Sequence, residues 1–421
     1  MKWKSTSELI SDLKDVERFL RMDATAIGHK EYLTGIRKFI SSKSPLRNQL
    51  AGHPIFNYWL HLFKRQRREL VFQERSMLLG LFQGFVAPLD IESRKKIVFR
   101  ASTDPDGRFY LYGTPYYVQI PGAAFPVEFE ISVSGENSLV KLRTGERLSI
   151  PLSKNSEIIP GIYAENKNWL LTSHVMDHNA VKLGKDGEDK FISTLRSALT
   201  DVKKKDPLLW LEMRELLRVL VPLVSPSPDI SVSSSYSRLP GAVALSHSDD
   251  AVLQAETLIH EYCHQKLNLL APIDSLLLPG QSGKIFYSPW RDDPRHLRGI
   301  LYGVHAFLNV VRYFRKRFDD DIEPQGKRRH LAGSTARRVF QMQDALQTLS
   351  YYGSFTEFGR RFLLGCWKEL GILRQGIESY PSGILEEQKR YCANHRKAYA
   401  LPGLGLHKGT PRKIVGETVR R

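Results

Sequence analysis

The spacing of apolar residues changes along the chain. In the first 92 residues, apolar side chains recur every three or four positions, which predicts amphipathic helices. From about Ser93 to Lys185 the pattern becomes alternating or β-branched, with DPDG, PG and GEN turns between the runs, which predicts short strands. The chain therefore begins with a helical region at 1–92, followed by a β-rich segment at 93–185.

Helical spacing returns at 190–205 and 207–224 and is broken by the SPSP run that follows. Two short strands are predicted at 230–236 and 242–246, and the second leads into a helix at 252–270 that ends before Pro272. Further helices are predicted at 297–318, 334–352 and 356–370. We therefore expect a helical region at 186–402 and a basic tail at 403–421.

Composition excludes several classes of protein. Of the 421 residues, 42% are hydrophobic and 25% are charged, which is typical of a folded globular chain. No stretch reaches about 18 consecutive apolar residues, so no membrane partner is expected. Three cysteines are too few for a disulfide framework, which favours a reducing, cytoplasmic location.

The net charge of +17 would attract nucleic acid, an anionic membrane or an acidic peptide, and the charge alone does not choose among them. No helix-turn-helix, zinc-finger or RNP pattern is present, so no specific nucleic-acid recognition is expected. Neither GxxxxGK[ST] nor GxGxxG occurs, so a nucleotide cofactor is not indicated.

The most informative motif lies on the predicted helix at 252–270. The side chains of Ser248, Asp249 and Asp250 are suited to cap its first N–H groups, and His260-Glu261-Tyr262-Cys263-His264 follows inside the helix. Residues four apart project from one helix face, so His260 and His264 can bind a single metal ion. In a metal hydrolase, Glu261 would accept the proton of a metal-bound water.

Two histidines do not complete a metal site, and the sequence offers several third ligands. Leu267 and Leu270 occupy the positions where a metzincin carries glycine and histidine, and no glutamate lies between His264 and Glu323 to make a thermolysin-like site. His305, on the next helix, is the preferred third ligand, although a structural role in the core is an equal alternative. Asp274 and Glu256 are the reserve candidates for the third ligand. His174 and His178 form a second histidine pair with four-residue spacing, in a stretch whose pattern does not separate a helix from a strand or loop.

The segment YSPWRDDPR, residues 287–295, carries two arginines close to the metal motif. With Asp293 as N-cap and Pro294 at the first helical position, Arg295 would lie in the opening turn of the His305 helix. Arg291 and Arg295 would then be able to bind a carboxylate near the metal. The alternative from the residues alone is a structural salt-bridge cluster with Asp292 and Asp293.

These features predict an α+β fold, mainly helical, with a β-rich middle segment and a zincin-like strand plus HExxH helix. The strand at 242–246 immediately precedes the HExxH helix. An extended peptide is expected to pair with this strand through backbone hydrogen bonds. This expectation suits a protein that modifies or cleaves peptides.

The chain resembles the HEXXH-motif family of peptide natural-product gene clusters, which are regarded as Fe(II)- and 2-oxoglutarate-dependent peptide β-hydroxylases. The resemblance rests on SVSSSYSRLPGAVALSHSDD, AETLIHEYCHQKLNLL, YSPWRDDPRHLRGILYGVHAF and GSFTEFGRRF in that order, and more faintly on HPIFNYWL. It covers most of the chain, and its HE-x-x-H-x-K-L and PWR-x-DPR motifs are more specific than HExxH alone.

The resemblance implies a reaction and a role for each residue. His260 and His264, with His305 as third ligand, would hold Fe(II), and 2-oxoglutarate and O2 would take the remaining positions. The products would be succinate and a side chain hydroxylated at its β-carbon, in a ribosomally synthesised precursor peptide. Arg291 and Arg295 would bind the distal carboxylate of 2-oxoglutarate, and Trp290 and Tyr287 would help to exclude water.

Two other functions stay open from the sequence. A zinc-dependent metallopeptidase would use the same helix, with Glu261 as catalytic base. A non-catalytic peptide-binding protein would use the basic surface instead. The sequence does not indicate the oligomeric state, a requirement for a leader peptide or the identity of the modified residue.

Overall fold

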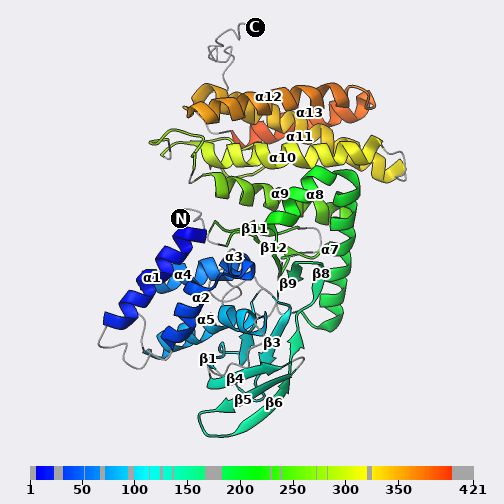
Figure 1. Ribbon diagram of the computed structural model, residues 1–421. Coiled ribbons are helices and arrows are strands. Elements are labelled where there is room, and N and C mark those ends of the chain that lie inside the picture. The colour runs from blue at the N-terminus through cyan, green and yellow to red at the C-terminus, as the bar shows by residue number, and fades with distance from the viewer. Residues whose placement is uncertain are drawn as a thin grey trace. The chain divides into compact units, whose positions relative to one another are not determined.

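The computed structural model shows an α+β protein that is mainly helical and contains several small sheets (Figure 1). It describes residues 6–22, 32–51, 53–66, 72–92, 99–112, 114–123, 127–134, 137–165, 183–227, 230–237, 239–271, 273–281, 283–319 and 325–400. The chain divides into two compact units. The first unit comprises Met1–Ala198 and Met213–Gln254, and the second comprises Leu199–Glu212 and Ala255–Arg421.

The first unit begins with helices that enclose an aromatic core. These helices are α1 (Thr6–Met22), α2 (Leu33–Ser41), α3 (Pro45–Ala51), α4 (Pro54–Gln66) and α5 (Phe72–Glu92). Phe39, Phe56, Trp59 and Phe82 are fully buried between them, and ring centroids such as those of Trp59 and Phe82 lie 4.6 Å apart. The prediction of amphipathic helices in this region is therefore confirmed, since the apolar faces of the helices together form the core.

Small antiparallel sheets follow in the β-rich segment. One sheet has the order β1-β4-β5-β6 and a second the order β2-β3-β7. Their strands are β1 (Phe99–Ser102), β2 (Arg108–Tyr110), β3 (Tyr116–Gln119), β4 (Glu128–Ser134), β5 (Asn137–Leu142), β6 (Arg147–Pro151) and β7 (Ser153–Lys154). Helix α5 packs closely here, because a Cβ at Gly84 would lie 2.2 Å from the carbonyl oxygen of Tyr110. Glycine therefore permits the helix to approach this backbone.

A five-stranded sheet with the order β11-β12-β10-β9-β8 completes the first unit. Its strands are β8 (Glu157–Ile159), β9 (Ile162–Ala164), β10 (Val219–Leu223), β11 (Ser233–Ser235) and β12 (Ala242–Ser246). Strand β12 is buried throughout; it pairs in parallel with β10 on one side and antiparallel with β11 on the other. The expectation that this strand offers an edge to an extended peptide is therefore wrong, because both of its edges already have partners.

The predicted helix at 207–224 is in fact a helix followed by a strand. Helix α8 spans Pro207–Leu216, and Val219–Leu223 forms β10, in which every residue is buried. A continuous apolar run is compatible with either a buried strand or a buried helix, so periodicity does not separate the two. Val219–Leu223 is a strand because it pairs with β9 and β12. The pairing with β9 ends at Leu220, so Pro222, which has no backbone N–H to donate, is tolerated in this strand.

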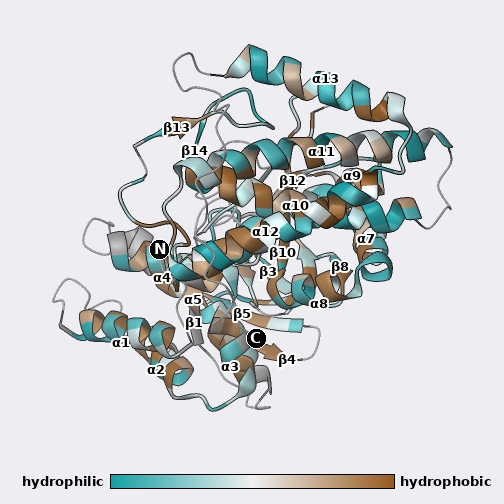
Figure 2. Ribbon diagram, turned by 90° about the horizontal axis from the view of Figure 1, so that it is seen from above, coloured by the Kyte–Doolittle hydropathy of each residue, from teal (hydrophilic) through white to brown (hydrophobic). Residues whose placement is uncertain are grey.

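The second unit consists mainly of long helices. Most of α9 (Ala251–Leu270) lies here with α10 (Leu297–Asp319), α11 (Gln325–Tyr352), α12 (Glu357–Ile377) and α13 (Ser382–Tyr399). Helix α11 packs against α10, α12 and α13. Figure 2 shows α13 as largely hydrophilic, and it buries few side chains, among them Ile384 and Cys392. Part of α7 (Lys185–Lys205) and most of α8 also belong to this unit.

The start of α10 differs from the expectation. Arg295 and His296 form the short strand β14, which pairs with β13 (Ile285–Phe286), and α10 begins at Leu297. Arg295 is therefore not in the first helical turn, because backbone pairing with Phe286 keeps it extended. The sequence reasoning also missed α13, and the predicted basic tail at 403–421 lies outside the described residues.

Among the described residues, no helix is long and apolar enough to span a membrane.

Candidate metal centre

Helix α9 carries the HExxH motif, and its start is capped as expected. The Asp250 carboxylate accepts hydrogen bonds from the backbone N–H of Val252 at 2.7 Å and of Leu253 at 3.4 Å. Gln254 reaches back and accepts from the N–H of Ser248 at 2.8 Å. These bonds satisfy the free donors of the first turn and set where the helix begins, and hence which residues share its faces.

The two motif histidines face each other on α9. Their Nε2 atoms lie 2.9 Å apart, and their ring centroids are separated by 4.4 Å with an interplanar angle of 86°. Glu261 is buried next to them, and one ligand atom from each of the three residues lies within 4.8 Å of the others. Among the described residues, this is the one group of three or more His, Cys, Asp or Glu side chains with such spacing.

Both histidines are electrostatically suited to bind a cation. Burial, followed by the charges of His264 and Arg338, holds the pKa of His260 well below its usual range. Burial also lowers the pKa of His264, although the Glu261 carboxylate opposes this shift. Both rings are therefore neutral near pH 7, and a neutral imidazole has a lone pair to donate to a metal.

The geometry of the histidine pair fits a first-row divalent metal. With metal–nitrogen bonds of about 2.0–2.1 Å, two nitrogens lie about 2.9 Å apart at a right angle and about 3.4 Å apart at a tetrahedral angle. The observed 2.9 Å is also a normal N–H···N hydrogen-bond length, so the two rings are bonded directly to each other here. A bound metal ion would take the place of that bond.

Aromatic residues of α10 pack against each histidine. The ring centroids of Phe307 and His260 lie 4.9 Å apart, and those of Trp290 and Phe307 lie 5.3 Å apart. The Tyr302 ring stacks on His264 at 5.9 Å. These contacts limit the rotation of both imidazoles and remove water from their edges.

Burial varies along the part of α9 that carries the motif. Leu253, two turns before His260, is 40% exposed. Glu261 and Leu267 are buried, at 4% and 1% exposure. His260 and His264 are themselves partly buried.

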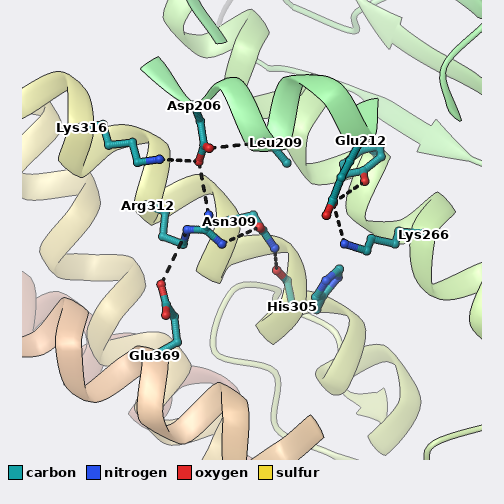
Figure 3. Close-up of polar contacts among 10 residues, drawn as sticks. Asp206, Leu209, Glu212, Lys266, His305, Asn309, Arg312, Lys316 and Glu369 are labelled. Atoms are coloured by element: carbon teal, nitrogen blue, oxygen red, sulfur yellow. Dashed lines mark hydrogen bonds and ion pairs between the residues drawn. The ribbon is translucent and has the colours of Figure 1, made fainter. Parts of the chain in front are cut away.

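His305 lies near the motif but outside the three-residue cluster. Its Nδ1 is buried and has no hydrogen-bond partner among the described residues. Burial, then the charges of Lys266 and His264, lowers its pKa to about 4, and the carbonyl of Cys263 opposes this shift. Figure 3 shows His305 beside Lys266, which itself donates to Glu212 at 2.6 Å.

An ion network centred on the buried carboxylate of Asp206 lies next to His305 on α10 (Figure 3). Asp206 is 1% exposed; it accepts from the N–H of Leu209 at 3.3 Å and from the ammonium of Lys316 at 2.9 Å. Arg312 approaches the same carboxylate at 3.4 Å and Glu369 at 3.7 Å. This network joins α8, α10 and α12, so it holds the helix that carries His305.

The reserve ligands have other partners. Glu256 pairs with Arg338 at 3.3 Å. Asp274 accepts from the N–H of Leu276 and from the hydroxyl of Thr356, both at 2.7 Å, which fixes the chain after α9. His174 and His178 lie outside the described residues.

The two arginines of the YSPWRDDPR segment share one counter-ion. Arg291 and Arg295 each lie 2.8 Å from the Asp293 carboxylate, and their side chains are 53% and 40% exposed. Asp293 therefore binds both arginines instead of capping α10. A carboxylate ligand would have to compete with Asp293 for either guanidinium.

The same segment is attached to other helices through its aromatic residues. Tyr287 shares a hydrogen bond of 2.8 Å with His395 of α13. The Trp290 indole packs onto Gly303 of α10, where a Cβ would lie only 2.2 Å from ring atom Cζ2. Arg338, Phe307 and Tyr302 also surround the cluster, and sequence reasoning missed all three. No local signal points to them, because helix packing brings them to α9.

No protein-family model matches the chain, and none of the curated proteins compared with it is similar to it.

Proposed function

We propose that this protein is a peptide β-hydroxylase that uses non-haem Fe(II), 2-oxoglutarate and O2 on a ribosomally synthesised precursor peptide. The observation that carries the proposal is the His260-Glu261-His264 cluster, whose ligand atoms lie within 4.8 Å of one another. Two histidines and one carboxylate with open positions are the ligand set of non-haem Fe(II) oxygenases. The proposal also rests on the motif likeness to the HEXXH-motif hydroxylases.

The residues of the cluster would have distinct roles. His260 and His264 would bind the metal through Nε2. Glu261 would supply the third ligand, a position for which the sequence favoured His305. Bound Fe(II), with 2-oxoglutarate and O2, supplies an oxidant that converts a C–H bond to C–OH while the cosubstrate yields succinate and CO2. Phe307 and Tyr302 would keep the imidazoles oriented, since their rings lie against His260 and His264.

Arg291 and Arg295 retain their proposed role in binding the distal carboxylate of 2-oxoglutarate. Both are partly exposed, and both have flexible side chains that reach one shared carboxylate, Asp293. Exchange of Asp293 for an incoming carboxylate would conserve the charge balance of the pair.

A zinc metallopeptidase is the alternative function. It would need Glu261 free to act as base and therefore a third protein ligand from elsewhere in the chain. Among the described residues, no further His, Cys, Asp or Glu joins the cluster within 4.8 Å. The ligand set therefore favours the oxygenase, in which Glu261 is a ligand and 2-oxoglutarate occupies open positions.

The deciding experiment is a titration of metal-free protein with Fe(II) and then 2-oxoglutarate in the absence of O2. We expect a saturable visible charge-transfer band that is lost in His260→Ala, while precursor-peptide binding is retained. Absence of the band, with tightly bound zinc and peptide-bond cleavage instead, would replace the hydroxylase with the peptidase.

A further inference from the structure

Arg338 of α11 connects three helices around His260. Its Nη2 lies 3.3 Å from Oε1 of Glu256 on α9. Its Nη1 donates to Gln341 on its own helix at 3.1 Å, and its guanidinium carbon lies 4.3 Å from the ring centroid of Phe307 on α10. The side chain is 26% exposed, so these contacts are partly shielded from water.

Two of the neighbours of Arg338 lie next to His260. Glu256 is four residues before His260, so the two side chains lie one turn apart on the same face of α9. Phe307 packs against the His260 ring at a centroid distance of 4.9 Å and an interplanar angle of 56°. Arg338 therefore contacts both Glu256, one turn before His260 on α9, and the Phe307 ring that packs against His260.

Gln341, one of the partners of Arg338, connects it to the packed segment around Trp290. Gln341 is buried at 3% exposure, and its Nε2 donates to the carbonyl of Pro289 at 2.7 Å. The next residue, Trp290, contacts Phe307 and is packed onto Gly303. A guanidinium held by a fork of hydrogen bonds and an aromatic face has little freedom to move.

We propose that Arg338 is a positioning residue for the metal centre, which fixes the orientation of the His260 imidazole through Glu256 and Phe307. This inference rests on the proposed metal centre. Side chains that orient a metal ligand typically change metal affinity by about 10- to 100-fold when they are removed. Arg338 is expected to belong to that class although it does not touch the metal.

The neighbouring residue offers a matched control. Arg337 lies on the same helix, donates to Gln388 at 2.8 Å and packs over the Tyr391 ring at 4.1 Å. Its partners are on α13 and do not contact the cluster histidines. Arg337→Gln therefore removes the same kinds of interaction from the same helix while sparing His260.

The experiment is a Co(II) titration of the metal-free full chain, followed through the visible absorption of the bound ion. Arg338→Gln is expected to weaken Co(II) binding by about 10- to 100-fold and to alter the spectrum of the loaded site, whereas Arg337→Gln stays within about twofold of the unchanged protein. Arg338→Lys, which keeps the charge, is expected to recover part of the affinity. Equal affinities and spectra for Arg338→Gln and Arg337→Gln would overturn the inference.

A second variant serves if Arg338→Gln fails to fold. Glu256→Gln keeps the size of the side chain and an acceptor oxygen but removes the ion pair, and it is expected to weaken Co(II) binding about 10-fold. Unchanged affinity would overturn the inference. His260→Ala separates the two proposals: if it leaves Co(II) binding unaltered, the proposed metal centre and this inference both fall. If it abolishes binding while the Arg338 variants do not weaken it, the inference alone falls.

Discussion

Replacing Gly303 by alanine would push a methyl group into the indole of Trp290. The added Cβ would lie 2.2 Å from Cζ2 and 2.5 Å from Cε2 of that ring. Normal carbon–carbon contact is about 3.5–4.0 Å, so the indole or the helix must move by about 1.3 Å. Because Trp290 packs on Phe307 and Phe307 on His260, we expect the displacement to reach the His260 ring.

Gly299, one turn earlier on α10, isolates the effect of the clash. A Cβ there meets only side-chain atoms of Arg295, the nearest at 3.6 Å, which is ordinary contact. Alanine is preferred over glycine in a helix by about 0.8–1.0 kcal/mol, so Gly299→Ala should stabilise the protein by up to about that amount. The same propensity gain applies at Gly303, so the two variants differ by the cost of overpacking alone, and we expect Gly303→Ala to be less stable than Gly299→Ala by about 1–3 kcal/mol.

Urea unfolding of both variants, followed by circular dichroism, measures this difference. Fe(II) or Co(II) titration then measures whether the displacement reaches His260, and weaker binding is expected only in Gly303→Ala. If the two variants were equally stable, the close packing of Trp290 on α10 would be refuted. Lower stability of Gly303→Ala with unaltered metal affinity would refute the transmission through Phe307.

Three other expectations follow from the described contacts. Burial, then the charge of Arg218, lowers the pKa of His53 to about 3, so the neutral ring favours folding above pH 6.5 and this contribution is lost as the pH falls towards 3. His53→Gln should therefore remove up to about 2.7 kcal/mol of the stability difference between pH 7 and pH 4.5 in urea unfolding, and an unchanged difference would contradict this. Asp206→Ala should lower the free energy of unfolding by about 2–3 kcal/mol in the same assay, because it removes the cap of α8 and the carboxylate shared by Arg312 and Lys316. A loss below about 0.5 kcal/mol would exclude a structural role for Asp206. Arg291→Gln or Arg295→Gln should raise the 2-oxoglutarate concentration needed for the charge-transfer band, and if neither does, the carboxylate is bound elsewhere.

Local features of this protein could be predicted from its sequence. The HExxH helix, its capping residues and the proximity of His260 to His264 all depend on residues within one or two turns. Helical periodicity makes such short-range geometry predictable, because residues four apart always meet on the same face. The predominance of helices and the strands of the middle segment follow from similar short-range patterns.

Contacts between distant segments decided the rest. Val219–Leu223 became a strand because β9 and β12 lie on either side of it, and Arg295 stayed extended because it pairs with Phe286. The surroundings of His260 depend on Phe307 and Arg338, which are 47 and 78 residues further along the chain. No periodicity records such distances, since helix packing is determined by the fit of whole surfaces. The sequence by itself therefore determined that His260 and His264 share one face of α9, and only the tertiary structure decided which residues surround them.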